Sequence, residues 1–342
     1  MNKLYILAFI AVLVSAIFTP IVKKIAFKFN VLDIPADARK VHKKPIPLLG
    51  GVAIYISFIS TLIFKSGKLS SSEMGIIIGA TIIVIGGIID DKYDIRPRYK
   101  LVFQILSSIV LIIFGLEINL VTNPGLSENL YLSLGWLSIP ITILWVIGIT
   151  NALNLIDGLD GLAAGVALIS SITMFIIAIL SNRPDAAILT AILSGAILGF
   201  LPYNFNPASI FMGDTGAQLL GFLLAAISIE GTIKSAAAFA IAVPILALGI
   251  PIYDTMFAVI RRKLNGKPIM QADRGHLHHR LLDMGLTQKE TVLVMYMISA
   301  ILGGVAIIAM QISSQRAYFV LAVVMIVLVI IAYKCGFFQH RD

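Results

Sequence analysis

Two adjacent carboxylates, Asp90 and Asp91, follow a stretch over residues 74–89 that carries no charged side chain. Ionised side by side, the two aspartates repel each other, so the pair is expected to require a bound cation, a Lys or Arg partner, or a raised pKa. A carboxylate pair at the point where an apolar helix ends is therefore the first indication of an active site.

A second polar segment begins with Asn151 and Asn154 and continues with Asp157 and Asp160, so that four polar side chains recur at intervals of three. On a helix, residues at this spacing share one face. Asn and Asp acting only as caps at a helix end are the alternative. The segment has no Lys or Arg of its own, however, so its aspartates lack a local partner.

Asp214 stands within residues 211–216, Phe-Met-Gly-Asp-Thr-Gly, where the next apolar helix is expected to begin. An isolated aspartate there could serve only as an N-cap. The start of a helix also offers free backbone amides to a phosphate. Phe211 is either an ordinary aromatic residue of the membrane edge or a flat surface for a base.

Residues 261–280 form a basic segment in which His276, His278 and His279 stand among arginines. A zinc site is the less favoured interpretation, because no Cys or nearby Glu completes it. Acidic helix ends together with a basic loop suggest a division of labour, in which carboxylates bind a hard cation while Arg and His bind phosphates.

Asp254 lies in an apolar stretch that contains Pro244, Gly249 and Pro251. An aspartate is costly within lipid and should face protein or a polar cleft. Pairing with Arg261 or Arg262 is favoured over a catalytic role.

The elements that must position these residues are membrane helices. The chain of 342 residues is 58% hydrophobic and 13% charged, with a mean hydropathy of +0.97. No polar stretch is long enough to bury a core of its own, so residues 1–342 are predicted to form one all-α polytopic membrane domain, with 261–290 as a cytoplasmic loop. About eleven spans are expected, at residues 4–22, 46–64, 74–89, 101–115, 136–155, 161–180, 187–201, 216–230, 236–260, 291–311 and 317–334.

Charge predicts the orientation of these spans. With the N-terminus outside and the C-terminus in the cytoplasm, most of the 26 Lys and Arg residues fall in short cytoplasmic segments. The net charge of +8 reflects mainly this bias, so no nucleic-acid partner is expected. The first apolar stretch is expected to remain as a helix rather than to be removed as a signal peptide. This topology brings the acidic residues to one face of the membrane, whereas a transporter would bury such groups nearer the midplane.

Five motifs in this order resemble the polyprenyl-phosphate N-acetylhexosamine-1-phosphate transferase superfamily, of the glycosyltransferase 4 type. They cover nearly the whole chain, at residues 43–51, 90–94, 151–165, 211–216 and 276–280. The His-Leu-His-His pattern from His276 to His279 looks like the bacterial undecaprenyl-phosphate GlcNAc-1-phosphate transferases. The branch that transfers phospho-MurNAc-pentapeptide typically has three consecutive histidines there, and this chain departs from that pattern.

The resemblance implies transfer of GlcNAc-1-phosphate from UDP-GlcNAc to undecaprenyl phosphate, which yields undecaprenyl-diphospho-GlcNAc and UMP. This would be the first membrane step of a cell-envelope glycan such as teichoic acid or O-antigen, in the bacterial cytoplasmic (inner) membrane. Mg²⁺, with Mn²⁺ as an alternative, and a homodimer are expected. A phospho-MurNAc-pentapeptide transferase, an enzyme for another UDP-N-acetylhexosamine, and a transporter or lipid flippase remain as alternatives.

The resemblance also implies roles for the acidic residues. Asp214 would be the best metal ligand, with Asp91 beside the metal. Asn154 and Asp157 would line the same pocket, and Asp157 would take part in catalysis. Asp90 is the family's usual candidate for removing a proton from the lipid phosphate, although positioning explains its presence equally well.

The remaining implied roles concern substrate binding. Asp160 would bind the uridine through hydrogen bonds, and Phe211 would stack on it. Phosphates would be held from the opposite loop by Arg274, His276, His278 and His279, with His279 also placed among the catalytic residues. Lys43 is a further candidate on the nucleotide side.

Overall fold

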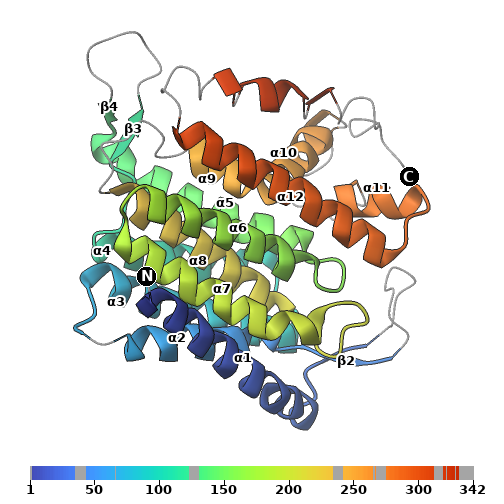
Figure 1. Cartoon of the computed structure of the whole chain (residues 1–342). Coiled ribbons are helices and arrows are strands. Elements are labelled where there is room, and N and C mark those ends of the chain that lie inside the picture. Colours follow the sequence, from blue (N-terminus) through green and yellow to red (C-terminus); the bar gives the residue numbers. More distant parts are fainter. Residues whose placement is uncertain are drawn as a thin grey trace.

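The structure is a computed structural model that describes residues 2–34, 44–65, 67–122, 131–233, 242–264, 266, 275–311, 319–320, 322–327 and 329–330. Its helices run roughly side by side as a bundle (Figure 1). In chain order they are α1 (Asn2–Lys28), α2 (Gly50–Phe64), α3 (Ser71–Tyr93), α4 (Pro97–Ile113), the 3₁₀ helix η1 (Gly135–Leu137), α5 (Ser138–Ile156), α6 (Leu162–Leu180), α7 (Pro184–Asn204), α8 (Gly213–Ile233), α9 (Ala242–Ala247), α10 (Gly249–Leu264), α11 (Leu277–Asp283) and α12 (Gln288–Gln311).

Strands are confined to two short antiparallel pairs in the described part of the chain. Strand β1 (Leu32–Asp33) pairs with β2 (Ile46–Pro47), and β3 (Leu120–Thr122) pairs with β4 (Tyr131–Ser133). The first pair matters for function, because it brings residues that follow α1 beside residues that precede α2.

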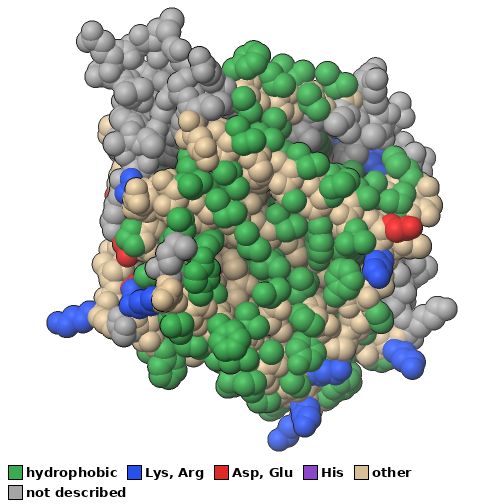
Figure 2. Space-filling model, in the orientation of Figure 1, with side chains coloured by type: hydrophobic (Ala, Val, Ile, Leu, Met, Phe, Trp, Pro, Cys, Tyr) green, Lys and Arg blue, Asp and Glu red, His purple; other side chains and the backbone are tan. Residues whose placement is uncertain are grey.

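Six helices of the described residues are long and apolar enough to cross a membrane, namely α1, α3, η1 together with α5, α6, α7 and α12. Hydrophobic side chains cover the middle of one face of the molecule, and Lys and Arg side chains stand at its margins (Figure 2). The predicted class, an all-α multi-pass membrane protein, is confirmed. The predicted span at 236–260 contains two helices, α9 and α10, with Leu248 between them. This is the stretch that contains Pro244, Gly249 and Pro251.

Helix α8 lies at the centre of the bundle and packs against α2, α3, α5, α6 and α7. Its apolar residues are buried all round the helix, as expected for an element enclosed by neighbours on every side. The first turn of α8, at Gly213 and Asp214, is therefore held in place by several elements, and it reaches the end of the bundle where the acidic residues gather.

Glycines allow the neighbouring backbones to approach this first turn. A Cβ on Gly51 of α2 would lie 2.2 Å from the Cα of Gly216, and a Cβ on Gly87 of α3 would lie 2.4 Å from the Cα of Thr215. Because larger residues would force the helices apart, the two glycines bring α2 and α3 into backbone contact with α8.

Candidate active site

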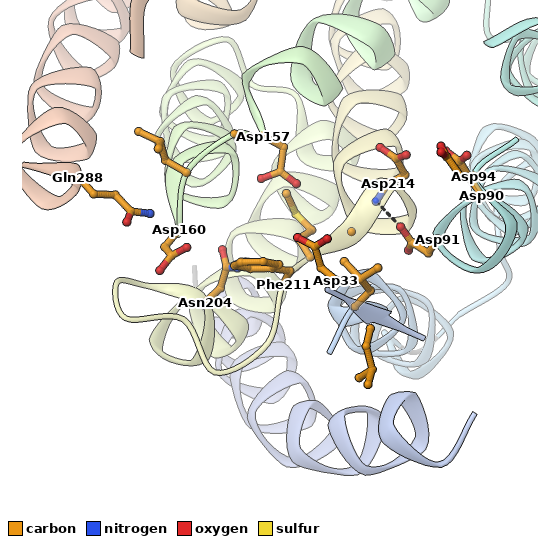
Figure 3. Close-up of a pocket in the computed structure, with 16 residues that line it drawn as sticks. Asp33, Asp90, Asp91, Asp94, Asp157, Asp160, Asn204, Phe211, Asp214 and Gln288 are labelled. Carbon is orange, nitrogen blue, oxygen red and sulfur yellow. Dashed lines mark hydrogen bonds between the residues drawn. The ribbon is translucent and has the colours of Figure 1, made fainter. Parts of the chain in front are cut away.

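A cavity of about 510 Å³ lies at one end of the bundle. Seven aspartates line it, from elements far apart in sequence: Asp33, Asp90, Asp91, Asp94, Asp157, Asp160 and Asp214. In Figure 3, Asp160 lies on one side of the Phe211 ring, Asp91 and Asp214 lie on the other, and Asp157 lies above the ring. The structure thus brings together in one cavity the acidic residues that the sequence analysis assigned to one membrane face.

Asp91 binds the start of α8. Its carboxylate accepts hydrogen bonds from the backbone amides of Asp214 at 2.7 Å and Thr215 at 3.2 Å, and from the Thr215 hydroxyl at 2.6 Å. These amides are the groups that a helix leaves without internal partners, so Asp91 caps α8 from another helix. The contacts favour a positioning role for Asp91 over the predicted role as a metal ligand.

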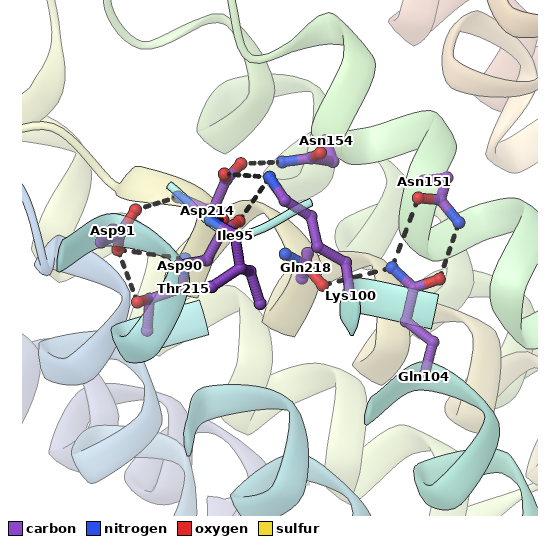
Figure 4. Close-up of polar contacts among 10 residues, drawn as sticks. All are labelled: Asp90, Asp91, Ile95, Lys100, Gln104, Asn151, Asn154, Asp214, Thr215 and Gln218. Carbon is purple, nitrogen blue, oxygen red and sulfur yellow. Dashed lines mark hydrogen bonds and ion pairs between the residues drawn. The ribbon is translucent and has the colours of Figure 1, made fainter. Parts of the chain in front are cut away.

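Lys100, in the first turns of α4, connects two of the aspartates (Figure 4). Its Nζ lies 2.5 Å from an oxygen of Asp90 and 2.8 Å from an oxygen of Asp214. The other oxygen of Asp214 accepts a hydrogen bond from the side-chain amide of Asn154. Asp90 also accepts a hydrogen bond of 3.1 Å from the amide of Ile95. The Lys partner required by the Asp90-Asp91 pair is therefore present, and it is bound to Asp90.

Asp157 is a partly buried carboxylate of the cavity. It follows the last residue of α5, and among the described residues no hydrogen bond or ion pair to its side chain is found. Burial, and after it the negative charges of Asp214, Asp91 and Asp160, raise the pKa of Asp157 to about 8. A cation beside Asp157 would relieve this repulsion.

The other end of the cavity is organised around Asp160. One oxygen of Asp160 accepts hydrogen bonds from the side-chain amide of Asn206 at 3.0 Å and from the backbone amide of Ala208 at 2.9 Å. Asn206 also donates to the side-chain oxygen of Gln288 at 3.0 Å. Asp160 therefore fixes the loop that leads to Phe211 and, at the same time, lines the cavity.

Phe211 is held through its backbone by the segment before α2. Its amide donates to the carbonyl of Pro47 at 2.8 Å, and its carbonyl accepts from the amide of Gly50 at 3.0 Å. The motif at residues 43–51 therefore acts at least partly through this pairing, which leaves the Phe211 ring at the cavity.

The histidine segment packs beside this cavity. His276 Nδ1 lies 2.7 Å from one oxygen of Asp254, and the other oxygen of Asp254 accepts a hydrogen bond from the amide of Leu277 at 2.8 Å. The predicted partners of Asp254, Arg261 or Arg262, are wrong. Its carboxylate is bound by His276 and by the amide of Leu277. The Arg261 side chain instead donates to the carbonyl of Gly275 at 3.0 Å.

His278 is buried against Gly158, where a Cβ would lie 2.7 Å from the His278 Nε2 atom. Neither ring nitrogen has a hydrogen-bond partner in the part of the chain that the structure describes. Burial lowers the pKa of His278 to about 3, a shift that His279 and His276 increase and Asp254 opposes. The ring of His279 lies 4.2 Å from that of His278, measured between centroids. Lys43 and Arg274 lie outside the described residues.

Residues that the sequence analysis did not select also line or support the cavity. Asp33, Asn204 and Gln288 line it, and Lys100 and Gln104 support it. The excess of carboxylates indicated that a cationic partner was needed, but only the packing of α4 against α3 and α5 identifies Lys100.

The donors around the cavity suit a hard cation. Within the described part of the chain, no three His, Cys, Asp or Glu side chains form a ready-made metal site. Mg²⁺ does not require one, since it usually takes one or two carboxylates and fills its other positions with water and substrate phosphates. Asp157, which has no partner within the described ranges, and Asp214 meet that requirement with oxygen atoms alone.

Comparisons with known proteins agree with this site. Residues 73–232, which include most of the cavity's aspartates, match Glycosyl transferase family 4. The Probable undecaprenyl-phosphate N-acetylglucosaminyl 1-phosphate transferase of Bacillus subtilis is 40% identical over 342 residues, which cover 100% of this chain and 94% of that protein. The Decaprenyl-phosphate N-acetylglucosaminephosphotransferase of Mycolicibacterium smegmatis is 32% identical, over 87% of this chain and 80% of its own.

A third relative, the Phospho-N-acetylmuramoyl-pentapeptide-transferase of Halalkalibacterium halodurans, is 32% identical over 80% of this chain and 86% of its own. Similarity of this extent confirms the family that the five motifs indicated. The chain belongs to glycosyl transferase family 4.

Proposed function

We propose that this protein transfers N-acetylglucosamine 1-phosphate from UDP-GlcNAc to undecaprenyl phosphate, giving undecaprenyl-diphospho-GlcNAc and UMP. The observation that carries the proposal is the 40% identity, over the full chain, with the B. subtilis protein named for this transfer. The acidic cavity at the end of a membrane bundle supports it, because a lipid phosphate at the bilayer surface and a soluble sugar nucleotide can meet only at a membrane edge.

The proposal also includes the orientation of the protein in the membrane. With the N-terminus outside and about eleven spans, the cavity opens to the cytoplasm, on the side where Lys and Arg residues are concentrated. The enzyme would then act in the bacterial cytoplasmic membrane, with the phosphate of its lipid substrate held at the inner surface.

Asp214 and Asp157 are the residues that would hold Mg²⁺ or Mn²⁺. Asp157 has no partner among the described residues, and Asp214 presents both oxygens in the cavity, to Lys100 and Asn154. A bound divalent ion would supply charge neutralisation for the diphosphate and for the UMP that leaves. Asp91 would act indirectly, because it binds the backbone amide of Asp214 and so holds that residue in place.

The bond changes in the reaction are simple. An oxygen of the lipid phosphate attacks the sugar-linked phosphorus of UDP-GlcNAc, and the bond from that phosphorus to the bridging oxygen breaks, so that UMP leaves with the electron pair. A phosphate monoester with a second pKa of about 6 is largely dianionic at pH 7 and needs little help from a base. We therefore propose that Asp90 holds the Lys100 ammonium toward the phosphates, a role for which its ion pair is suited.

The Asp160 end of the cavity is the proposed uridine site. Phe211 offers a flat ring there, and Asp160 and Gln288 offer oxygens that accept hydrogen bonds. His276, His278 and His279 adjoin this region through the contact of His278 with Gly158. A role for Arg274 and Lys43 in holding phosphates stays a prediction from the resemblance.

Transfer of phospho-MurNAc-pentapeptide is the second candidate, favoured by the 32% identity with the H. halodurans protein. The spacing of His276, His278 and His279 argues against it. A single assay separates the two reactions: the purified protein in vesicles is given undecaprenyl phosphate, Mg²⁺ and one labelled UDP-sugar at a time.

We expect UMP and a labelled lipid with UDP-GlcNAc, and at most a trace of product with UDP-MurNAc-pentapeptide or UDP-GalNAc. Release of UDP in place of UMP would indicate ordinary glycosyl transfer. Turnover with none of the UDP-sugars would refute the proposed function.

A further inference from the structure

Below the cavity, three side chains form an amide layer: Gln104 on α4, Asn151 on α5 and Gln218 on α8 (Figure 4). Gln104 and Gln218 are buried, and Asn151 is partly buried. Gln104 is fully buried. Its nitrogen donates to the side-chain oxygens of Asn151 at 3.3 Å and Gln218 at 3.2 Å, and its oxygen accepts a hydrogen bond of 2.8 Å from Asn151. One amide group therefore joins three helices inside the bundle.

The amide layer stands one helical turn from the site. Side chains three or four residues apart on a helix lie above one another on the same face. Each of the three helices contributes one such pair, with one residue at the site above and one in the amide layer below. The pairs are Lys100 and Gln104 on α4, Asn154 and Asn151 on α5, and Asp214 and Gln218 on α8. The three upper residues meet at the Asp214 carboxylate, and the three lower ones meet at the Gln104 amide.

Two of the three helices have a further fixed contact. A Cβ on Gly221 of α8 would lie 2.6 Å from the Cα of Thr150 on α5, so these backbones touch. Helix α4 packs closely against α3, where a Cβ on Gly86 would lie 2.5 Å from the ring of Phe103, but toward α5 and α8 its polar contacts come from the site and the amide layer. Of its described side chains, Lys100 and Gln104 form hydrogen bonds or ion pairs with other helices, whereas Ser107 and Ser108 bond back to carbonyls of α4 itself.

We propose that Gln104 and Gln218 are positioning residues for the transfer reaction. Rotation or sliding of α4 against α8 would leave buried amides without partners, which is costly away from water. The amide layer therefore fixes α4, and the fixed helix holds the Lys100 ammonium between Asp90 and Asp214. The inference rests on the proposed function, because it takes the Asp214 carboxylate as the place of reaction.

The first test compares Gln104→Leu with a control, Ser194→Ala. The control also removes a partly buried hydrogen bond between helices, the 2.9 Å contact of Ser194 on α7 with Ser171 on α6, and neither of these residues lines the cavity. We expect Gln104→Leu to lower kcat by tenfold to about a hundredfold, as for a displaced catalytic group. KM for UDP-GlcNAc should stay within about twofold, because Asp160 and Phe211 are untouched.

A triple variant separates positioning from stability. Gln104→Leu leaves the side-chain oxygen of Gln218 without its donor and leaves Asn151 only its bond to the Ile147 carbonyl, so it should lower Tm. Replacing all three residues by Leu removes these amides and should restore Tm. We expect the triple variant to keep the low kcat of the single variant. Recovery of kcat together with Tm would show a merely structural role and would overturn the proposal.

A measurement independent of turnover follows Lys100 itself. Acylation of its amine by acetic anhydride, quantified by mass spectrometry, should be slow in the wild type and at least threefold faster in Gln104→Leu and the triple variant, but unchanged in Ser194→Ala. Equal labelling in all four proteins would overturn the positioning role. A wild type that turns over no UDP-sugar would refute the proposed function, and the labelling would still test the amide layer.

Discussion

The Thr215 hydroxyl of α8 donates a 2.6 Å hydrogen bond to the carboxylate of Asp91, the residue near the end of α3. Together with the amides of Asp214 and Thr215, it gives that carboxylate three donors from a single helix start. The acidic pair is thereby divided: Asp91 binds the backbone of α8, and Asp90 binds Lys100. The two carboxylates can stand side by side because each is bound by a different element, Asp91 by hydrogen-bond donors of α8 and Asp90 by the ammonium of Lys100.

The cap leads to a first prediction, on Thr215. Thr215→Val removes the hydroxyl donor, whereas Thr215→Ser keeps it. We expect Thr215→Val to lower the free energy of unfolding by about 1 kcal/mol, the usual cost of losing a hydrogen bond at a cap, and to lower kcat several-fold because Asp214 is no longer held as firmly. Thr215→Ser should resemble the wild type. Thermal unfolding in detergent and turnover measure the two effects, and equal values for both variants would contradict the role given to the hydroxyl.

The second prediction concerns Lys100. Lys100→Met removes the ammonium and leaves Asp90 and Asp214 to repel each other at close range. We expect turnover to fall at least a hundredfold, as for loss of a group that stabilises charge in the reaction. Lys100→Arg keeps the charge and should retain measurable activity. If Lys100→Met turned over at more than a tenth of the wild-type rate, the ion pairs would be structural only.

Much of the site was predictable from the sequence, because its aspartates lie at the ends of long apolar segments. Span boundaries and charge asymmetry are local features, and they assigned Asp90, Asp157 and Asp214 to one face of the membrane before any helix was placed. Placing them at one face required no knowledge of which helices are neighbours, and the structure then shows them in one cavity.

What escaped prediction depends on which helices touch. Lys100 and Gln104 look like ordinary residues of an amphipathic helix until α4 is placed beside α5 and α8. The partner of Asp254 illustrates the same limit, since Arg261 and Arg262 are near in sequence, whereas His276 is brought to Asp254 by the return of the chain after α10. Proximity in sequence was a poor guide to both contacts.

The third prediction tests the cation site through stability. Because Asp157 is partly buried among other carboxylates and has no partner among the described residues, removing its charge should not harm the fold. We expect Asp157→Asn to unfold at the same temperature as the wild type or higher, yet to lose nearly all turnover. Millimolar Mg²⁺ should raise the Tm of the wild type, as any ligand of the native state does. It should raise the Tm of Asp157→Asn or Asp214→Asn much less, and an equal rise in all three would place the cation elsewhere.

The fourth prediction is a pH dependence of stability from His278. Its pKa is about 3 in the folded protein and about 6.5 when unfolded. The unfolded chain therefore binds more protons between these values, and folding loses up to about 1.4 kcal/mol per pH unit as the pH falls below 6.5. The contribution is fully present above pH 6.5. The wild-type Tm should fall more steeply between pH 6.5 and 5 than that of His278→Gln, and parallel curves would contradict a buried neutral histidine.

The last prediction concerns recognition of the base. The Phe211 backbone is fixed on both sides by Pro47 and Gly50, so its ring can be changed without moving the loop that carries it. Stacking of a base on an aromatic ring is worth about 1–3 kcal/mol, which corresponds to roughly five- to 150-fold in affinity. We expect Phe211→Leu to raise KM for UDP-GlcNAc within that range while kcat changes little, and Phe211→Tyr to bind nearly as well as the wild type. KM for undecaprenyl phosphate should be unaffected by either change. If Phe211→Leu raised that KM instead, the ring would contact the lipid substrate, and the uridine site would have to lie elsewhere in the cavity.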